Sequence, residues 1–102
     1  MNVKEADWKL YRSRIADWQE NYMERLCKEY IELLSSDQNA SDRFWAVFDK
    51  IKEDSTKTGV ITRNARSSMA HNIIRLLREG AITFDDLDGF SDELIEYIQK
   101  MN

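Results

Sequence analysis

The sequence predicts an all-α fold, a compact bundle of four to five helices that forms one domain over residues 1–102. It contains no proline and only three glycines, whereas β-rich and loop-rich folds need many turn residues. Hydrophobic residues make up 42% of the chain and charged residues 33%, which is typical of a globular protein rather than a disordered one. We therefore expect helices joined by short polar links around one core.

The longest helical pattern covers Ile15–Leu34, and we expect the bundle to pack around it. Apolar residues recur there every three or four positions, so they line one side of a helix. A second apolar row beside the first makes this side wider than a coiled-coil seam, which predicts contacts with several neighbours. The first row consists of Ile15, Trp18, Tyr22, Leu26, Tyr30 and Leu33, and the second of Met23, Cys27, Ile31 and Leu34.

The N-terminal segment carries two large aromatic residues, Trp8 and Tyr11, which continue the same spacing backwards. Ser13 has the side chain of a helix N-cap, with an aspartate early in the following turns. The pattern therefore favours a short first helix and a break near Ser13–Ala16, and one continuous helix is the alternative. We expect most aromatic residues to be core, but Trp8 and Tyr11 are also a candidate hydrophobic interface for a second copy or a partner.

A second helix is expected between two polar links. Ser35–Ala40 forms the first link, and Ser41 is the expected N-cap. Ser55–Gly59 forms the second link, in which Gly59 gives the freedom that a turn needs. The helix between them carries an apolar stripe with Trp45 beside it, made of Phe44, Val47, Phe48 and Ile51.

The third helix is expected to open at Thr62 or Asn64 and to end at Glu79. Gly80 directly after it is a typical C-terminal stop. The apolar side of this helix consists of Met69, Ile73, Leu76 and Leu77.

The C-terminal quarter is expected to form a short helical element and a last helix. Thr83 and Asp86 have the spacing of a capping box at the start of the short element, and Gly89 ends it. Ser91 is the expected cap of the last helix. The inward residues of this last helix are Leu94, Ile95 and Ile98.

Charge is divided along the second half of the chain. Ser55–Arg78 holds five basic residues and no carboxylate, and Glu79–Tyr97 holds seven carboxylates and no basic residue. The basic helix is a candidate surface for a protein partner or for nucleic-acid phosphates. The expectation that we favour over both is that its arginines pair with the following carboxylates inside the fold. The candidate contact residues are Arg63, Arg66, Ser67, His71, Arg75 and Arg78.

We expect no enzymatic activity, no metal and no cofactor. Cys27 and His71 are the only residues of their types and lie in different helices, whereas a metal site needs several ligands. Aligning Gly89 with the glycine of an EF-hand loop puts Phe84 where the first aspartate belongs, so the aspartates are expected to cap helices and face water. Cys27 is expected to point inward as a small hydrophobic residue.

Two stretches resemble a known family. They are DWQENYMERLCKEYIELL (Asp17–Leu34) and GVITRNARSSMAHNIIRLLREGAITFDDLDGFSDEL (Gly59–Leu94). They are similar to a family of short, acidic, all-helical bacterial proteins sometimes labelled multidrug transporters. The resemblance implies an all-helical fold and brings no catalytic or binding residue with it. No stretch here has the ~20 apolar residues of a membrane helix, so we interpret the label as a misnomer.

The resulting prediction is a non-enzymatic interaction or regulatory protein that has a protein partner or associates with itself. A cytoplasmic location is expected because the single cysteine cannot form an internal disulfide and no membrane segment is present. One alternative is a small nucleic-acid-binding regulator that uses the Arg63–Arg78 helix. The other is an inhibitor that presents the acidic Glu79–Glu96 surface to a basic target.

Overall fold

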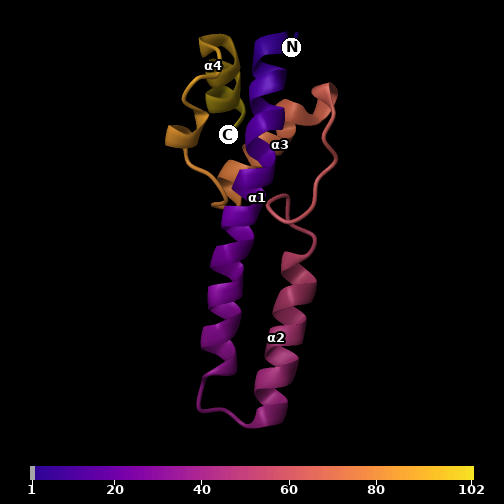
Figure 1. Ribbon diagram of the computed structural model, residues 1–102, viewed down its shortest axis with the longest axis vertical. Helices are drawn as coiled ribbons and strands as arrows, with labels where there is room; N and C mark the ends of the chain where they lie inside the picture. Colours follow the sequence, from indigo (N-terminus) through magenta and orange to yellow (C-terminus); the bar gives the residue numbers. More distant parts are fainter. Residues whose placement is uncertain (1) are drawn as a thin grey trace.

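The computed structural model describes residues 2–102, and every regular element within that range is helical (Figure 1). The predicted all-α bundle around one long helix is confirmed. The four α-helices are α1 (Glu5–Leu34), α2 (Ala40–Asp54), α3 (Met69–Arg78) and α4 (Asp92–Met101). Two short 3-10 helices complete the chain, η1 (Arg66–Ser68) before α3 and η2 (Phe84–Leu87) between α3 and α4.

Helix α1 is one unbroken helix of 30 residues, so the break expected near Ser13–Ala16 is wrong. Ser13 does not cap a helix, because its hydroxyl donates a 2.7 Å hydrogen bond to the carbonyl of Leu10 within α1. The segment contains neither glycine nor proline to interrupt it. Residues before and after Ser13 also pack into the same core, which favours a continuous helix.

The core lies where the first half of α1 meets α3, η2 and α4, and we call this part the head (Figure 1). Aromatic rings of α1 pack in sequence, with Trp8 and Tyr11 stacked at 5.8 Å and Tyr11 and Trp18 edge to face at 6.3 Å. Trp18 in turn lies 6.2 Å from Phe90. The aliphatic residues of the core are Ile15, Ile73, Ile74, Leu76, Ile82, Leu87, Leu94 and Ile98.

The second half of α1, from Tyr22 onward, and α2 form an antiparallel hairpin that extends away from the head, and we call it the arm (Figure 1). The molecule is accordingly elongated, at 52 × 24 × 22 Å. Arg43 closes the tip of the arm, because its guanidinium donates to the carbonyls of Leu34 at 2.7 Å and Gln38 at 2.9 Å. Helix α2 begins at Ala40 with no side-chain cap, so the expected capping by Ser41 is wrong.

The link between α2 and α3 is longer than expected, and its glycine has a different role. The φ angle of Gly59 is not positive, but a Cβ atom there would lie 2.2–2.8 Å from ring atoms of Tyr22. Gly59 therefore allows the link to approach the arm closely. Asn64 does not open a helix, because its side chain accepts a 2.7 Å hydrogen bond from the Tyr11 hydroxyl, and α3 starts only after η1.

The expected turns of the C-terminal quarter are confirmed. Gly80 has a φ of 74° directly beyond α3, and the Thr83 amide donates a 2.8 Å hydrogen bond to the Asp86 carboxylate. Ser91 caps α4 by accepting from the Leu94 amide at 3.2 Å. The buried carboxylate of Asp7 accepts from both the amide and the hydroxyl of Ser91, at 2.8 and 2.6 Å, and so fixes α4 against α1.

Candidate functional site

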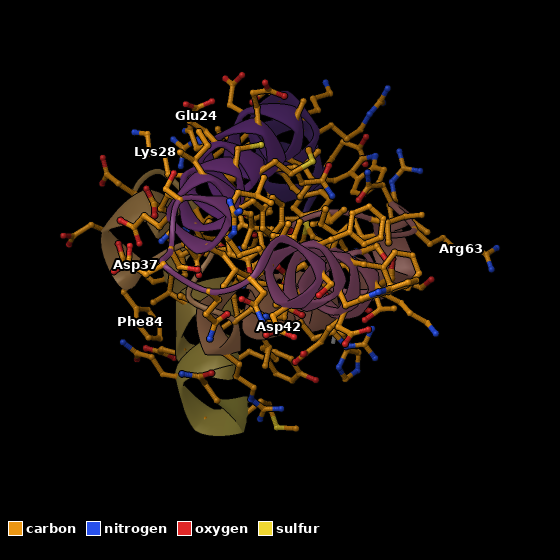
Figure 2. The ribbon with its side chains drawn as sticks, turned by 90° about the horizontal axis from the view of Figure 1, so that it is seen from below. Glu24, Lys28, Asp37, Asp42, Arg63 and Phe84 are labelled. Carbon is orange, nitrogen blue, oxygen red and sulfur yellow. The ribbon has the colours of Figure 1, made fainter. Side chains whose placement is uncertain are left out.

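The structure divides the candidate residues of the basic segment into those whose side chains are bonded to other parts of the protein and those whose side chains are not. Arg66 forms a two-pronged contact with Glu5, at 2.9 and 3.3 Å, which lowers the pKa of that carboxyl group, and its guanidinium lies over the ring of Trp8. Arg78 donates to the carbonyl of Met101 at 2.9 Å. All six candidates are exposed, and the side chains of Arg63, Ser67, His71 and Arg75 make no hydrogen bond or ion pair within residues 2–102. Arg63 points outward in Figure 2.

The expected pairing of these arginines with the following carboxylates is wrong. Within residues 2–102, no ion pair joins the Arg63–Arg78 segment to the Glu79–Glu96 stretch. The carboxylate of Glu79 accepts instead from the amides of Thr58 and Gly59, at 3.1 and 3.2 Å. Two arginines of α1 bind backbone carbonyl groups in this part of the chain. Arg14 donates to the carbonyl of Asp86 in the acidic stretch, and Arg25 donates to the carbonyl of Gly80 in the turn after α3.

Trp8 and Tyr11 do not form an exposed interface, so that candidate is wrong. They are 7% and 0% exposed and belong to the core of the head. The Tyr11 hydroxyl donates to Asn64 at 2.7 Å and accepts from Asn72 at 3.0 Å, and burial raises the pKa of Tyr11. A buried tyrosine with both hydrogen-bonding roles satisfied is a core residue that also ties the α2–α3 link to α1.

The large exposed apolar residues lie mainly on the arm instead. On α2 the exposed fraction is 60% for Phe44, 57% for Trp45 and 49% for Phe48. The three rings pack edge to face on one another, with centroids 5.0 and 5.6 Å apart. The remaining members are Ile51 at 45%, Ile31 at 63% and Leu34 at 45%.

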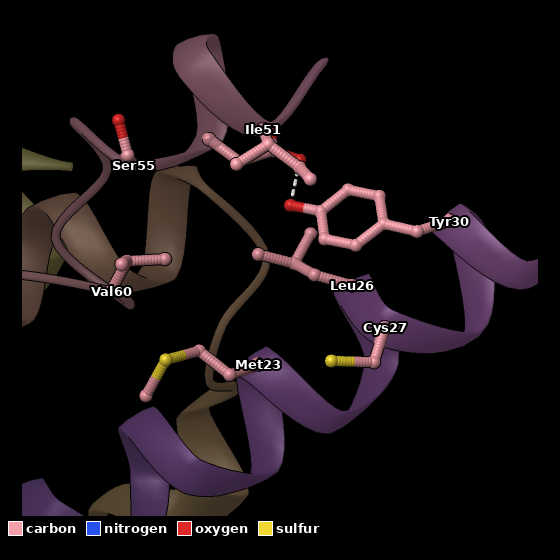
Figure 3. Close-up of a pocket in the computed structure, with 8 residues that line it drawn as sticks. Met23, Leu26, Cys27, Tyr30, Ile51, Ser55 and Val60 are labelled. Atoms are coloured by element: carbon pink, nitrogen blue, oxygen red, sulfur yellow. Dashed lines mark hydrogen bonds between the residues drawn. The ribbon is translucent and has the colours of Figure 1, made fainter. Parts of the chain in front are cut away.

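These residues share one side of the arm. Met23 and Cys27 of α1 and Ile51 of α2 line the same hollow of about 160 Å³ (Figure 3). Ile31 follows Cys27 by four residues and Phe48 precedes Ile51 by three, so helical periodicity continues both rows toward the tip of the arm. We call this side the arm face, and it consists of Met23, Cys27, Ile31, Leu34, Phe44, Trp45, Phe48 and Ile51.

Cys27 therefore differs from its expected position. It is a free and exposed thiol on the arm face rather than a buried hydrophobic residue. It does belong to the second apolar row, as predicted, but no segment of the described chain covers that part of the row.

The opposite side of the arm is polar. Lys50 and Glu29 form an ion pair of 3.4 Å between α2 and α1. The surface hollow on this side is lined by both of these residues together with Glu32, Leu33 and Ser36. The arm as a whole is therefore amphipathic, with one charged side and one apolar side.

A buried carboxylate closes the base of the arm face. Asp54 is 2% exposed and accepts from Tyr30 at 2.8 Å, and it forms ion pairs with Lys50 at 3.1 Å and Lys57 at 3.2 Å. Burial alone raises the pKa of Asp54, but the three hydrogen bonds outweigh burial and leave that pKa below its usual value. Burial, with the Asp54 contact, raises the pKa of Tyr30. Asp54 is thus held ionised as an anchor between α1, α2 and the following link.

The acidic stretch forms a separate open hollow on the head, of about 510 Å³, lined by Asp85, Asp88 and Asp92 and by Phe84. Among residues 2–102, no group of three or more histidine, cysteine, aspartate or glutamate side chains is placed to hold a metal ion. No helix of the described chain combines the length and the apolar character needed to cross a membrane.

Comparison of the chain with protein-family models, with curated proteins and with solved structures found no significant match. The resemblance that the sequence suggested therefore stays a prediction. The arm face had a signal in the sequence, which was the second apolar row of α1 together with the aromatic stripe of α2.

Proposed function

We propose that this protein is a non-enzymatic interaction protein of the cytoplasm and that the arm face is its binding surface. The proposal is carried by one observation, which is the exposure of six large apolar side chains on the two helices of the arm, in rows that helical periodicity places on one side. Scattered exposed apolar residues are normal on a protein surface, whereas a contiguous patch of this size is typical of an interaction site. Three of the six are aromatic, and aromatic residues are enriched in binding interfaces.

Further support comes from the way the two buried carboxylates are used. Asp7 and Asp54 both accept hydrogen bonds that fix helices to one another. His71 lies exposed on α3. These groups act as structural anchors or surface residues, which agrees with a role in binding rather than in bond making.

The two alternative functions have less support. In a nucleic-acid-binding surface on the basic helix, two of the four arginines already bind other parts of the protein. Arg66 binds the carboxylate of Glu5, and Arg78 donates to a carbonyl at the C-terminal end of α4. An inhibitor that presents the acidic stretch would use a surface without exposed aromatic residues other than Phe84. Neither surface approaches the apolar area of the arm face.

The proposal is tested by photo-cross-linking in the native cell. Phe48 is replaced by a photoreactive phenylalanine analogue, and Phe84, an exposed phenylalanine of the head, is replaced in the matched control. We expect a light-dependent protein adduct from position 48 and little or none from position 84. Equal yields at the two positions, or no adduct from position 48, would contradict the proposal.

A further inference from the structure

We propose that the protein that covers the arm face is a second copy of this chain, and that the two arms form an antiparallel four-helix bundle. This inference rests on the proposed function, since it names the partner of the same surface. A hairpin of two antiparallel helices with one apolar side has the form of half of such a bundle. The missing half is supplied by any identical hairpin, because a two-fold axis brings the same surface of both copies together.

The apolar area of the arm face is sufficient for a stable dimer. An aromatic side chain presents roughly 200 Å² when it is exposed. At their exposed fractions, the three rings and the three large aliphatic side chains present roughly 600 Å² in all. A standard interface buries about 800 Å² on each partner, of which roughly 500 Å² is apolar. The arm face therefore supplies the apolar core of a standard interface without any other part of the chain.

The charged edges of the arm determine which two-fold arrangement fits. The Glu29–Lys50 ion pair shows that these two residues lie at one level along the arm. Lys28 on the outer edge of α1 and Asp49 on the outer edge of α2 adjoin this level, and both are exposed. Figure 2 shows Lys28, together with Glu24, on the side of α1 that faces away from α2.

One helical turn nearer the head, the outer edges carry Glu24 on α1 and Lys52 on α2. A two-fold axis parallel to the arm places α1 of one copy against α2 of the other at the same level. Lys28 then faces the second copy's Asp49, and Glu24 faces the second copy's Lys52. Opposite charges therefore meet along both edges, which favours this arrangement.

The other face-to-face arrangement has its axis across the arm and places α1 against α1. The outer edge of α1 carries Glu20 and Glu24 with Lys28 as its one basic residue. Two copies of this edge would bring mostly like charges together. The geometry therefore points to a dimer whose heads lie at the same end.

The first test is the molecular mass of the purified full-length chain in solution. Sedimentation equilibrium is expected to give twice the 12.1 kDa of one chain at micromolar concentration. Phe48→Glu is expected to weaken association at least roughly 100-fold, because it buries an unpaired charge at the centre of the interface. Phe84→Glu is the control and leaves association unchanged. A monomer at every concentration, or a dimer that persists in Phe48→Glu, would overturn the proposal.

The second test separates the arrangement of the copies from general hydrophobic association. Glu24→Lys and Lys52→Glu are each expected to raise the dissociation constant about three- to ten-fold, since each sets like charges opposite one another in both symmetric contacts. The double variant Glu24→Lys/Lys52→Glu restores the opposite charges and is expected to return to the wild-type value. Both positions are exposed, so folding is retained and circular dichroism verifies it. If the two substitutions weakened dimer association additively in the double variant, the proposed arrangement of the two copies would be overturned.

The outcome of the cross-linking experiment keeps this inference distinct from the proposed function. An adduct from position 48 with the mass of two chains supports both. A different protein in the adduct, together with a monomeric pure chain, overturns the second-copy proposal and leaves the proposed function standing. No adduct overturns both.

Discussion

The hydroxyl of Tyr30 donates a 2.8 Å hydrogen bond to the carboxylate of Asp54, and this contact joins the two helices of the arm (Figure 3). Asp54 is also bonded to Lys50 within α2 and to Lys57 in the link beyond it. One buried carboxylate therefore holds α1, α2 and the start of the link in a fixed relation. The arm face keeps its shape because of this cluster.

Replacing Asp54 by asparagine is expected to destabilise the protein by about 1–3 kcal/mol at neutral pH. The substitution removes the charge that two lysines face and leaves a buried group with poorer hydrogen bonds. Urea unfolding followed by circular dichroism measures the loss. Glu53→Gln is the matched control at an exposed neighbouring position and is expected to change stability by less than about 0.5 kcal/mol. An equal loss in both variants would contradict the anchoring role of Asp54.

The same cluster predicts a pH dependence of stability. The pKa of Asp54 is lowered in the folded protein, so its contribution is present above the unfolded value of about 3.9 and is lost as the pH falls through the folded value. The pKa of Lys50 is raised, chiefly by its bond to Asp54, so its contribution is lost as the pH rises above about 10. The free-energy difference between wild type and Asp54→Asn should be constant between these limits and shrink below pH ~4. A difference that grows in acid would contradict the account.

Gly59→Ala is expected to destabilise the protein by about 1–3 kcal/mol. A Cβ atom at this position would lie within 2.2 Å of the Tyr22 ring, which is buried and cannot swing away. Gly80 has open space around it but a φ of 74°, so Gly80→Ala strains the backbone instead. Adding Tyr22→Ala should relieve the clash in Gly59→Ala but leave the cost of Gly80→Ala unchanged. A double-mutant cycle with no coupling between positions 22 and 59 would rule out this close approach.

Truncation of a tryptophan to alanine is expected to reduce stability much more in the head than in the arm. Trp8→Ala should cost about 3–5 kcal/mol because it opens a cavity in the core, where Trp8 is 7% exposed. Trp45→Ala should change the stability of the monomer by about 1 kcal/mol or less, because this ring is 57% exposed and only its contact with Phe44 is lost in a Phe48→Glu background. Both variants are measured in a Phe48→Glu background, so that association does not add to stability. Similar losses in the two variants would contradict the assignment of core and face.

The sequence allowed the helices, the core row of α1 and the C-terminal turns to be predicted because each depends on neighbouring residues. Gly80, Ser91 and the Thr83–Asp86 pair act within a single turn. The continuity of α1 through Ser13 was not predictable in this way, because the core residues on both sides of it decide the matter rather than its capping tendency.

The candidate interface was placed at the wrong end of α1 for a related reason. Periodicity shows that a helix has an apolar side, but it does not show whether a segment of the same chain covers that side. Trp8 and Tyr11 are covered by α3 and the link, whereas the row of Ile31 and Leu34 extends beyond every other element except α2. The Tyr30–Asp54 hydrogen bond joins positions 24 residues apart and left no local signal, although Lys50 and Lys57 lie only four and three residues from Asp54.

The reactivity of Cys27 is the most direct measure of whether a second copy covers the arm face. This single thiol lies on the face and is exposed in one chain. Its reaction rate with a thiol reagent is expected to fall as protein concentration rises, in proportion to the fraction of monomer, and to stay fast at all concentrations in Phe48→Glu. A rate that is fast and independent of concentration in the wild-type protein would contradict the proposed pairing of the arms.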